Sequence, residues 1–510
     1  MLEVTEIKRL IDDDTTSERK RLARVGQRYY EGDHDIKDYR LFYYNTDGEL
    51  VEDKTRSNER ISHPFFTELV DQLTAYVLSN PENIIKSDDS TLQEHLDEYF
   101  DEDFWAEISE LLTGSYAKGF EYLYAYKNAE DRIAFDCADG LGVIEVRAKD
   151  TDDNTEYHIY WYIDRVDKGR KPIVKIQVHT DRDITYFEQS GKSGKIELDK
   201  DEPINPKPNV IYVDDKGQKS GKALGFVPFF RFDYNKKQVS GLKPIKGLID
   251  DYDLMECGLS NNLQDFDTPI HIVKGFQGDN LDELQQNIKT KKIVGVDSDG
   301  GMDVMTVDVP YEARKTKADE DEKNIYRFGM GLNTIGLKDT SATTNIAIKM
   351  AYTLLDLKAE KVEKRLKKFL KQIIKIVLAE INEKNGTGYQ VKDVYFDFKH
   401  DIIVNEQENA QNEQVKATTE QVKINTILNI AAYVGDEQTL RAICEIMDWD
   451  FDELQSTLDL ADEEADTLDA METLEGIEPD DDDIQGISDG EKESQQAVLE
   501  MLDELLKELE

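Results

Sequence analysis

Two glycine-containing segments come closest to a site that could bind a nucleotide. Gly331 and Gly336, with Lys338 behind them, approach the spacing of a phosphate-binding loop, in which backbone amides and a lysine bind the phosphates. However, the lysine comes one residue late, neither serine nor threonine follows it, and a charged helix rather than a strand is expected before it. The second segment, Gly217–Lys222, fails on its spacing. We therefore predict no nucleotide site and no cofactor.

Three aspartates have a spacing that could bind calcium through carboxylate oxygens. Asp297, Asp299 and Asp303 are separated as in a calcium-binding loop, but Gly301 occupies a position where a further ligand belongs, and no glutamate closes the loop. The segment Asp297–Gly301 is instead typical of a hairpin turn.

The histidines and cysteines show no spacing that is typical of a metal site or a catalytic site. The seven histidines show neither HxxxH nor HExxH spacing, which zinc sites on helices use. Cys137, Cys257 and Cys444 lie far apart without a CxxC pair, as expected for a reduced chain without structural zinc. No GxSxG motif is present, and among 109 acidic residues any close pair of carboxylates arises by chance. We predict no metal site and no catalytic residue, and we expect that the protein is not an enzyme.

The chain of 510 residues carries a formal charge of −46. Proteins that grip nucleic acid neutralise phosphates with basic surfaces, so this charge argues against a DNA clamp. The negative charge is compatible with a protein surface past which DNA slides, because acidic groups repel the phosphates and keep the contact weak. Residues 459–510 hold 21 Asp and Glu against two Lys, which is typical of a solvated acidic tail. No apolar run approaches the ~20 residues of a membrane span, and the polar residues 1–20 resemble neither a signal nor a transit peptide.

The N-terminal half has hydrophobic spacing that predicts helices followed by an antiparallel β region. Up to residue 20 we expect a frayed arm with one short helix. Further helices are expected at 61–78 and at 92–126, and a loop rich in lysine and glycine at 191–222. The expected strands are 156–163, 173–178, 184–187 and, at a sheet edge because Pro228 cannot donate a ladder hydrogen bond, 225–232.

The C-terminal half has a pattern of two helices on either side of a small unit, followed by a very long helix. The fold class is therefore α+β and predominantly helical. The elements expected are helix 241–266; a β-α-β-β unit at 268–310 with strands 270–273, 293–296 and 304–309 and helix 281–288; helix 311–328; loop 329–344; a helix of roughly 60 Å at 343–384; strand 394–398; helices within 406–447; and a terminal amphipathic helix at 497–509.

Several sequence blocks, taken in order, resemble the portal proteins of long-tailed bacteriophages that infect Gram-positive hosts. Each block is weak by itself, but together they cover most of the chain. A leucine-serine pair replaces the glycine-containing turn of the family before Asn80, and the C-terminal part matches only in its acidic character. The blocks are Arg28–Ile36, Asn58–Phe65 continuing to Tyr76–Pro81, Ser115–Tyr124, Gly225–Phe229 through Leu248–Asp253, and Asn261–Gly275.

This resemblance implies a portal fold with a wing, a stem, a clip and a crown that assembles as a ring. Two long helices alone bury little, so neighbouring copies, usually twelve in this family, would supply the missing contacts. The implied parts are the arm and wing at 1–240, a stem helix at 241–267, the clip at 268–310, a second stem helix at 311–328, a tunnel loop at 329–344, the long helix and strand of the wing at 345–405, a helical crown at 406–460 and an acidic tail with its terminal helix at 461–510.

The resemblance further implies a channel for double-stranded DNA at one capsid vertex of the virion, used in packaging and ejection. DNA contact would be weak and non-specific, and no membrane would be involved. Assembly would take place in the host cytoplasm. The implied partners are the terminase large subunit, a head-completion adaptor protein, and the major capsid and scaffolding proteins. The alternative is an acidic scaffold or adaptor protein of another virion assembly, without a DNA channel.

Two segments would then face the DNA. On helix 311–328, polar residues recur at steps of three or four, although a solvated face with local ion pairs fits them equally well. The ten Lys and Arg at 349–384 are interpreted as contacts with acidic neighbouring subunits. The predicted channel residues are Arg314, Lys317, Asp321, Asn324 and Arg327 on the helix, and Asn333, Thr334, Lys338, Thr340 and Ser341 on the glycine-containing loop 329–344.

Overall fold

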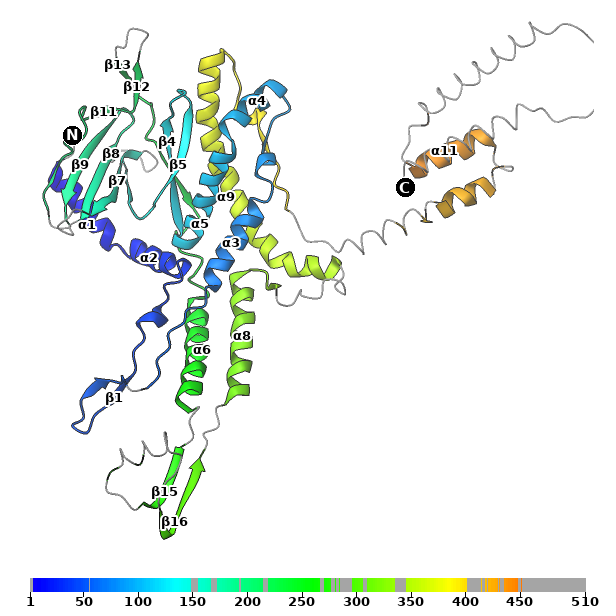
Figure 1. The fold of residues 1–510 in the computed structure, drawn as a ribbon. Coiled ribbons are helices and arrows are strands. Elements are labelled where there is room, and N and C mark those ends of the chain that lie inside the picture. Colours follow the sequence, from blue (N-terminus) through cyan, green and yellow to red (C-terminus); the bar gives the residue numbers. More distant parts are fainter. Residues whose placement is uncertain are drawn as a thin grey trace, which may run out of the picture. The chain divides into compact units, whose positions relative to one another are not determined.

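The computed structural model divides the chain into two compact units, residues 1–405 and 406–510. Helices and antiparallel sheets both occur in the first unit, in agreement with the expected mixture (Figure 1). No helix among the described residues is both long and apolar enough to span a bilayer. The described residues are 3–54, 56–147, 155–166, 172–191, 194–213, 219–266, 270–276, 296–305, 310–334, 345–400, 421–429, 435–447 and a few isolated positions between 280 and 451.

Two helices open the chain, α1 Val4–Thr16 and α2 Glu18–Tyr30. Ser17 separates them, and its side chain accepts a hydrogen bond from the backbone N–H of Lys20, which caps α2. Ile7 of α1 is fully buried in a cluster with residues of the larger sheet. The prediction of one helix up to residue 20 is confirmed, but the prediction of a frayed arm is wrong, because α1 is amphipathic and buries its apolar side against strands.

A strand follows α5 where a continuous helix was expected. The segment folds as α4 Ser90–Tyr99 and α5 Glu102–Lys118, and α5 ends at Gly119, whose φ of 101° lies in the left-handed region. Beyond this glycine, aromatic residues alternate and form β4 Phe120–Lys127. The prediction of a helix as far as residue 126 is wrong, because the hydrophobic period changes from 3.6 to 2 at Gly119.

The strand β4 is the centre of a three-stranded antiparallel sheet with the order β14-β4-β5. Its neighbours are β5 Ile133–Ala138 and β14 Phe229–Asp233. The predicted edge position of the segment 225–232 is confirmed. Pro228 lies just before β14, and its carbonyl oxygen accepts a hydrogen bond from Ala125 N at 2.8 Å.

A second antiparallel sheet has the order β10-β9-β8-β7-β6, with β11 also paired to β9. The predicted strands in this region are confirmed as β7, β8 and β9. The interpretation of 191–222 as a loop is wrong in part, because the segment contains short strands. Lysine and glycine are uncommon in strands, so its composition did not indicate them. The strands are β6 Val143–Arg147, β7 Thr155–Val166, β8 Pro172–His179, β9 Asp183–Ser190, β10 Ile196–Leu198, β11 Lys207–Pro208, and the separate hairpin β12 Val210–Val213 with β13 Lys219–Lys222.

Two helices, α6 Lys246–Phe266 and α8 Tyr311–Gly329, lie side by side (Figure 1). The bounds of α8 agree with the prediction to within one residue. In contrast, α6 begins five residues later than expected. Gly241 packs against the ring of Tyr116, where a Cβ would lie only 1.7 Å from a ring carbon, and residues 241–245 form turns.

Between these helices, the described residues form one antiparallel pair, β15 Ile270–Phe276 with β16 Val296–Met305. Asp297–Gly301 lies inside β16, so the predicted hairpin turn is wrong. The pairing register shifts around Gly275, whose φ is 66°, and glycines on both strands therefore accommodate a bulge rather than a turn. The helix expected at 281–288 lies almost entirely outside the described residues.

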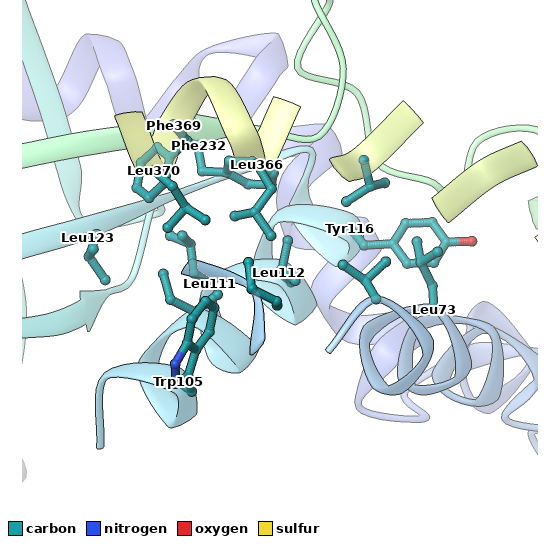
Figure 2. Packing of buried hydrophobic residues seen from close by; sticks show 14 of the residues in the cluster. Leu73, Trp105, Leu111, Leu112, Tyr116, Leu123, Phe232, Leu366, Phe369 and Leu370 are labelled. Carbon is teal, nitrogen blue, oxygen red and sulfur yellow. The ribbon is translucent and has the colours of Figure 1, made fainter. Parts of the chain in front are cut away.

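The long helix is confirmed as α9 Asn345–Asn385, with 41 residues. It packs against α3 Phe65–Val77 and β14. The short strand after it is β17 Tyr395–Phe396, which pairs with β3 Ile85–Lys86. Figure 2 shows the core where these elements meet α5, and it labels Leu73, Trp105, Leu111, Leu112, Tyr116, Leu123, Phe232, Leu366, Phe369 and Leu370.

In the second unit, the described residues are helical at 421–429 and in α11 Asp436–Met447. Cys444 of α11 is buried. These elements agree with the helices expected within 406–447, whereas the expected terminal helix at 497–509 lies outside the described residues.

Candidate functional site

The helix α8 carries the five residues predicted to face DNA, but two of them contact α6 and a third is buried. Lys317 Nζ contacts Asp251 Oδ2 of α6 at 2.6 Å and also pairs with Asp321 one turn further along α8. Hydrogen bonds to these carboxylates raise the pKa of Lys317. Asp321 is only 3% exposed, and Arg314 Nη1 lies 3.5 Å from the carbonyl oxygen of Met255. Arg314 and Lys317 therefore join two helices of one subunit, and Asp321 pairs with Lys317.

The predicted stripe is consequently not one free face of α8. Gly258 of α6 permits the close approach of the Arg314 side chain, since a Cβ at this position would lie 2.8 Å from Arg314 Nη1. Of the remaining stripe residues, Asn324 is half-buried and Arg327 is exposed.

The exposed face of α8 instead carries charges of both signs. Three acids and three bases lie there, so a passing phosphate would meet a cation beside an anion at each turn. Such a surface can touch DNA but cannot grip it, because tight binding needs net neutralisation of phosphates. The exposed charged residues are Glu312, Lys315, Asp319, Glu320, Lys323 and Arg327.

The first residues after α8 are held by α3. Met330 ends the helix with a φ of 53°. The side-chain amide of Gln72 donates to Leu332 O at 2.9 Å and accepts from Leu332 N at 3.0 Å. Gly331 packs against Leu69, where a Cβ would lie 2.1 Å from Leu69 Cδ2. This glycine therefore permits close packing of the chain against α3.

Two predicted loop residues lie within the described part of the chain. Asn333 Nδ2 donates to Glu322 Oε1 of α8 at 3.1 Å, and Thr334 is exposed. Lys338, Thr340 and Ser341 lie outside the described residues.

A buried lysine, whose internal role sequence reasoning missed by counting it among the contacts with neighbouring subunits, fastens α9 to the end of α8. Lys358 is 5% exposed, and its Nζ donates to Gly329 O at 2.5 Å and to the hydroxyl of Tyr116 on α5. The ammonium group also lies 4.1 Å from the centroid of that ring. Burial lowers the pKa of Lys358 to about 7. The sequence feature that could have indicated this buried lysine is its position next to the apolar stripe of the predicted long helix.

A buried aspartate of α6 was also missed. Asp253 Oδ2 lies 2.7 Å from His34 Nδ1, while Asp253 Oδ1 accepts from His63 N at 2.9 Å and lies 2.8 Å from His63 Nδ1. Burial alone would raise the pKa of Asp253, but the hydrogen bonds from both histidines outweigh it and the pKa is lowered. This cluster holds the N-terminal segment 31–64 along α6.

Among the described residues, one group of carboxylates is close enough to share a metal ion: Glu188, Asp199 and Asp201. Lys175 Nζ lies 2.9, 2.7 and 3.5 Å from their respective oxygens. The ammonium group of Lys175 already lies within ion-pair distance of all three carboxylates, so the arrangement is best described as an ion-pair cluster.

Comparison with known proteins identifies the family to which the chain belongs. The family model described as phage portal protein, SPP1 Gp6-like, matches residues 8–466. The portal protein of Bacillus phage SPP1 is 26% identical over 414 residues, which cover 80% of this chain and 79% of that protein. The portal protein of Clostridium phage phiCD119 is 24% identical over 419 residues, which cover 80% of this chain and 88% of that protein. The resemblance seen in the sequence blocks is confirmed, and the chain belongs to the SPP1 Gp6-like family of phage portal proteins.

Proposed function

We propose that twelve copies of this chain form a ring whose central channel passes double-stranded DNA into and out of a phage capsid. The family match over residues 8–466 carries the proposal. The helix pair α6–α8 supports it, because α8 buries few apolar side chains within its own chain, chiefly Ile325 and Tyr326. Heterologous contacts repeated around a ring would cover such helices from both sides.

The order of elements supports an assignment of parts. The helices α6 and α8 would form the stem, with a clip between them at the end that meets other proteins. The assigned parts are the wing at 1–240 and 345–405, the stem helices at 241–267 and 311–328, the clip at 268–310, the tunnel loop at 329–344, the crown at 406–460 and the acidic tail at 461–510.

The mixed charge on α8 supports passage of DNA rather than binding. Arg314, Lys317 and Asp321 would hold the stem helices together. The residues proposed to touch passing phosphates are Asn324 and Arg327 on α8 and Asn333, Thr334, Lys338, Thr340 and Ser341 on the tunnel loop.

Portal proteins are components of the virion. The clip of this chain would dock the terminase large subunit during packaging and the head-completion adaptor protein afterwards. The wing would meet the major capsid and scaffolding proteins at one vertex, after assembly in the host cytoplasm.

Imaging of the purified full chain by negative-stain electron microscopy tests the ring. We expect toothed rings with a central hole and a mass near twelve times that of the chain. A monodisperse monomer across a wide concentration range would contradict the proposal. Rings or filaments without a channel would instead indicate an acidic scaffold or adaptor protein.

The tunnel loop has its own test. Lys338→Ala combined with shortening of the glycine-containing segment should leave the rings intact and reduce DNA packaging in a reconstituted system. Normal packaging by these rings would end the tunnel-loop assignment.

A further inference from the structure

One face of α9 carries five exposed lysines that recur at steps of three and four residues, and they therefore form a single stripe about 21 Å long. Lys364 contacts only Glu360 of its own helix, at 3.2 Å. The other four make no ion pair with any residue in the described ranges. This surface, called the lysine face below, consists of Lys361, Lys364, Lys368, Lys371 and Lys375.

The lysine face continues at its N-terminal end into exposed apolar side chains. Met350, Leu354 and Leu357 occupy the same side of α9, and Met350 is 72% exposed. The opposite side of the helix is fully buried, for example at Leu366. A helix with a complete buried stripe needs no second apolar patch for its own fold, so this side is available for another molecule.

A surface of opposite charge lies on α4 and the first turns of α5. Residues 88–110 contain ten Asp and Glu and no Lys or Arg. Within the described part of the chain, the cation paired with them is Arg132, which lies 3.4 Å from Glu98. This surface, called the acidic face below, exposes Asp88, Asp89, Glu94, Asp97, Glu98, Asp101, Glu102, Asp103 and Glu110.

The two faces belong to the same unit of the chain, yet none of the described ion pairs joins them. We propose that the lysine face of one copy binds the acidic face of the neighbouring copy. This inference rests on the ring proposed above and names one contact that closes it.

Charge complementarity favours a second copy over nucleic acid as the occupant. A head-to-tail contact neutralises both faces of every subunit at once and repeats around the ring. A nucleic acid would neutralise only the lysines and would be repelled by the acids. Both faces lie on preformed helices, so docking orders no additional backbone.

The triple variant Lys364→Glu, Lys368→Glu, Lys371→Glu tests the lysine face in the full chain. We expect the fraction of protein in rings, measured by mass photometry at about 0.15 M salt, to fall at least about tenfold, because like charges then oppose each other. Circular dichroism should remain that of the wild type, since the three side chains are exposed. The matched control is Lys195→Glu, Lys236→Glu, Lys237→Glu, which makes the same charge change at exposed lysines elsewhere and should leave rings intact.

Charge exchange identifies the acceptor. The variant Glu94→Lys, Asp97→Lys, Glu110→Lys should also fail to form rings alone. An equimolar mixture of the two triple variants should form rings, because the faces that meet between the two variants then carry opposite charges. A chain carrying all six changes should form rings by itself for the same reason.

Three outcomes would overturn the inference. Rings of the lysine variant at wild-type yield would show that the lysine face is not a subunit contact, and loss of DNA binding by those rings would identify nucleic acid as its occupant. Failure of both the mixture and the six-fold variant to restore rings would exclude the acidic face. A wild-type chain that forms no rings would remove the proposed function together with this contact.

Discussion

The helix pair α6–α8 and the core around α3, α5 and α9 are stabilised by different forces. In the core, Phe66, Leu366 and Ile373 are completely buried, and such side chains contribute ~1.5–3 kcal/mol each. The helix pair relies on contacts such as Lys317 with Asp251, which are partly exposed and contribute ~0–1 kcal/mol. The part proposed to lie nearest DNA is therefore stabilised less by its own chain than the core is, which fits a structure completed by neighbouring copies.

Removal of a large core side chain should give the largest effect. Phe66→Ala should lower the free energy of unfolding by ~3–5 kcal/mol, because it leaves a cavity in a fully packed region. Urea denaturation followed by tryptophan fluorescence measures the change. Leu198→Ala is the control, since Leu198 is 45% exposed, and it should cost less than ~0.5 kcal/mol. Similar losses for both variants would contradict the described packing.

Asp253 is the exception within the helix pair, because it is buried. Asp253→Ala should cost ~3 kcal/mol, since it leaves His34, His63 and a backbone N–H without their acceptor. Hydrogen exchange should show faster exchange in residues 31–64.

The lowered pKa of Asp253 also predicts a dependence of stability on pH. The contribution of Asp253 to the free energy of unfolding is present above the ordinary aspartate pKa and is lost as the pH falls through the lowered value. The difference between wild type and variant should therefore shrink in acid, and a constant difference would argue against the ion-paired cluster.

Lys358 lies where the two regions meet, and it predicts a dependence on pH. Its pKa of about 7 is below the ordinary lysine value, so the unfolded chain binds more protons between pH 7 and 10.5 and stability rises with pH in this window. The wild type should gain on the order of 2 kcal/mol from this group between pH 7 and 9. Lys358→Met should lack that gain while sharing all other titrating groups. Parallel pH profiles of the two proteins would show that Lys358 is not buried as described.

Asp251 should give the smallest effect. Asp251→Asn removes the partly exposed ion pair with Lys317 and should change the unfolding free energy of the isolated subunit by ~0.2–1 kcal/mol, because Lys317 keeps its pair with the buried Asp321. Thermal unfolding under conditions that keep the chain monomeric provides the measurement. A loss above ~2 kcal/mol would mean that polar contacts stabilise α6–α8 as strongly as apolar burial stabilises the core.

Much of the helical architecture could be predicted from local spacing. The bounds of α9 follow from apolar residues at steps of three and four, and the edge position of β14 follows from Pro228. The sequence predicted two strands, 293–296 and 304–309, on either side of a turn in place of the single bulged strand β16. Aspartate and glycine favour a turn locally, and only pairing with β15 makes them part of a strand. Sequence blocks in order were sufficient to identify the family.

Periodicity determined which residues share a side of α8, but not which neighbour covers that side. The sequence placed Arg314, Lys317 and Asp321 on one stripe, and packing of α6 turned that stripe inward. Likewise, the contacts of Gly331 with Leu69 and of Lys358 with Gly329 join residues far apart in the chain. By itself the sequence determined the long helices, the charge and the family, because these depend on local spacing and composition. Only the tertiary structure decided which polar side chains form contacts inside the subunit, because burial depends on the surfaces that distant segments bring together.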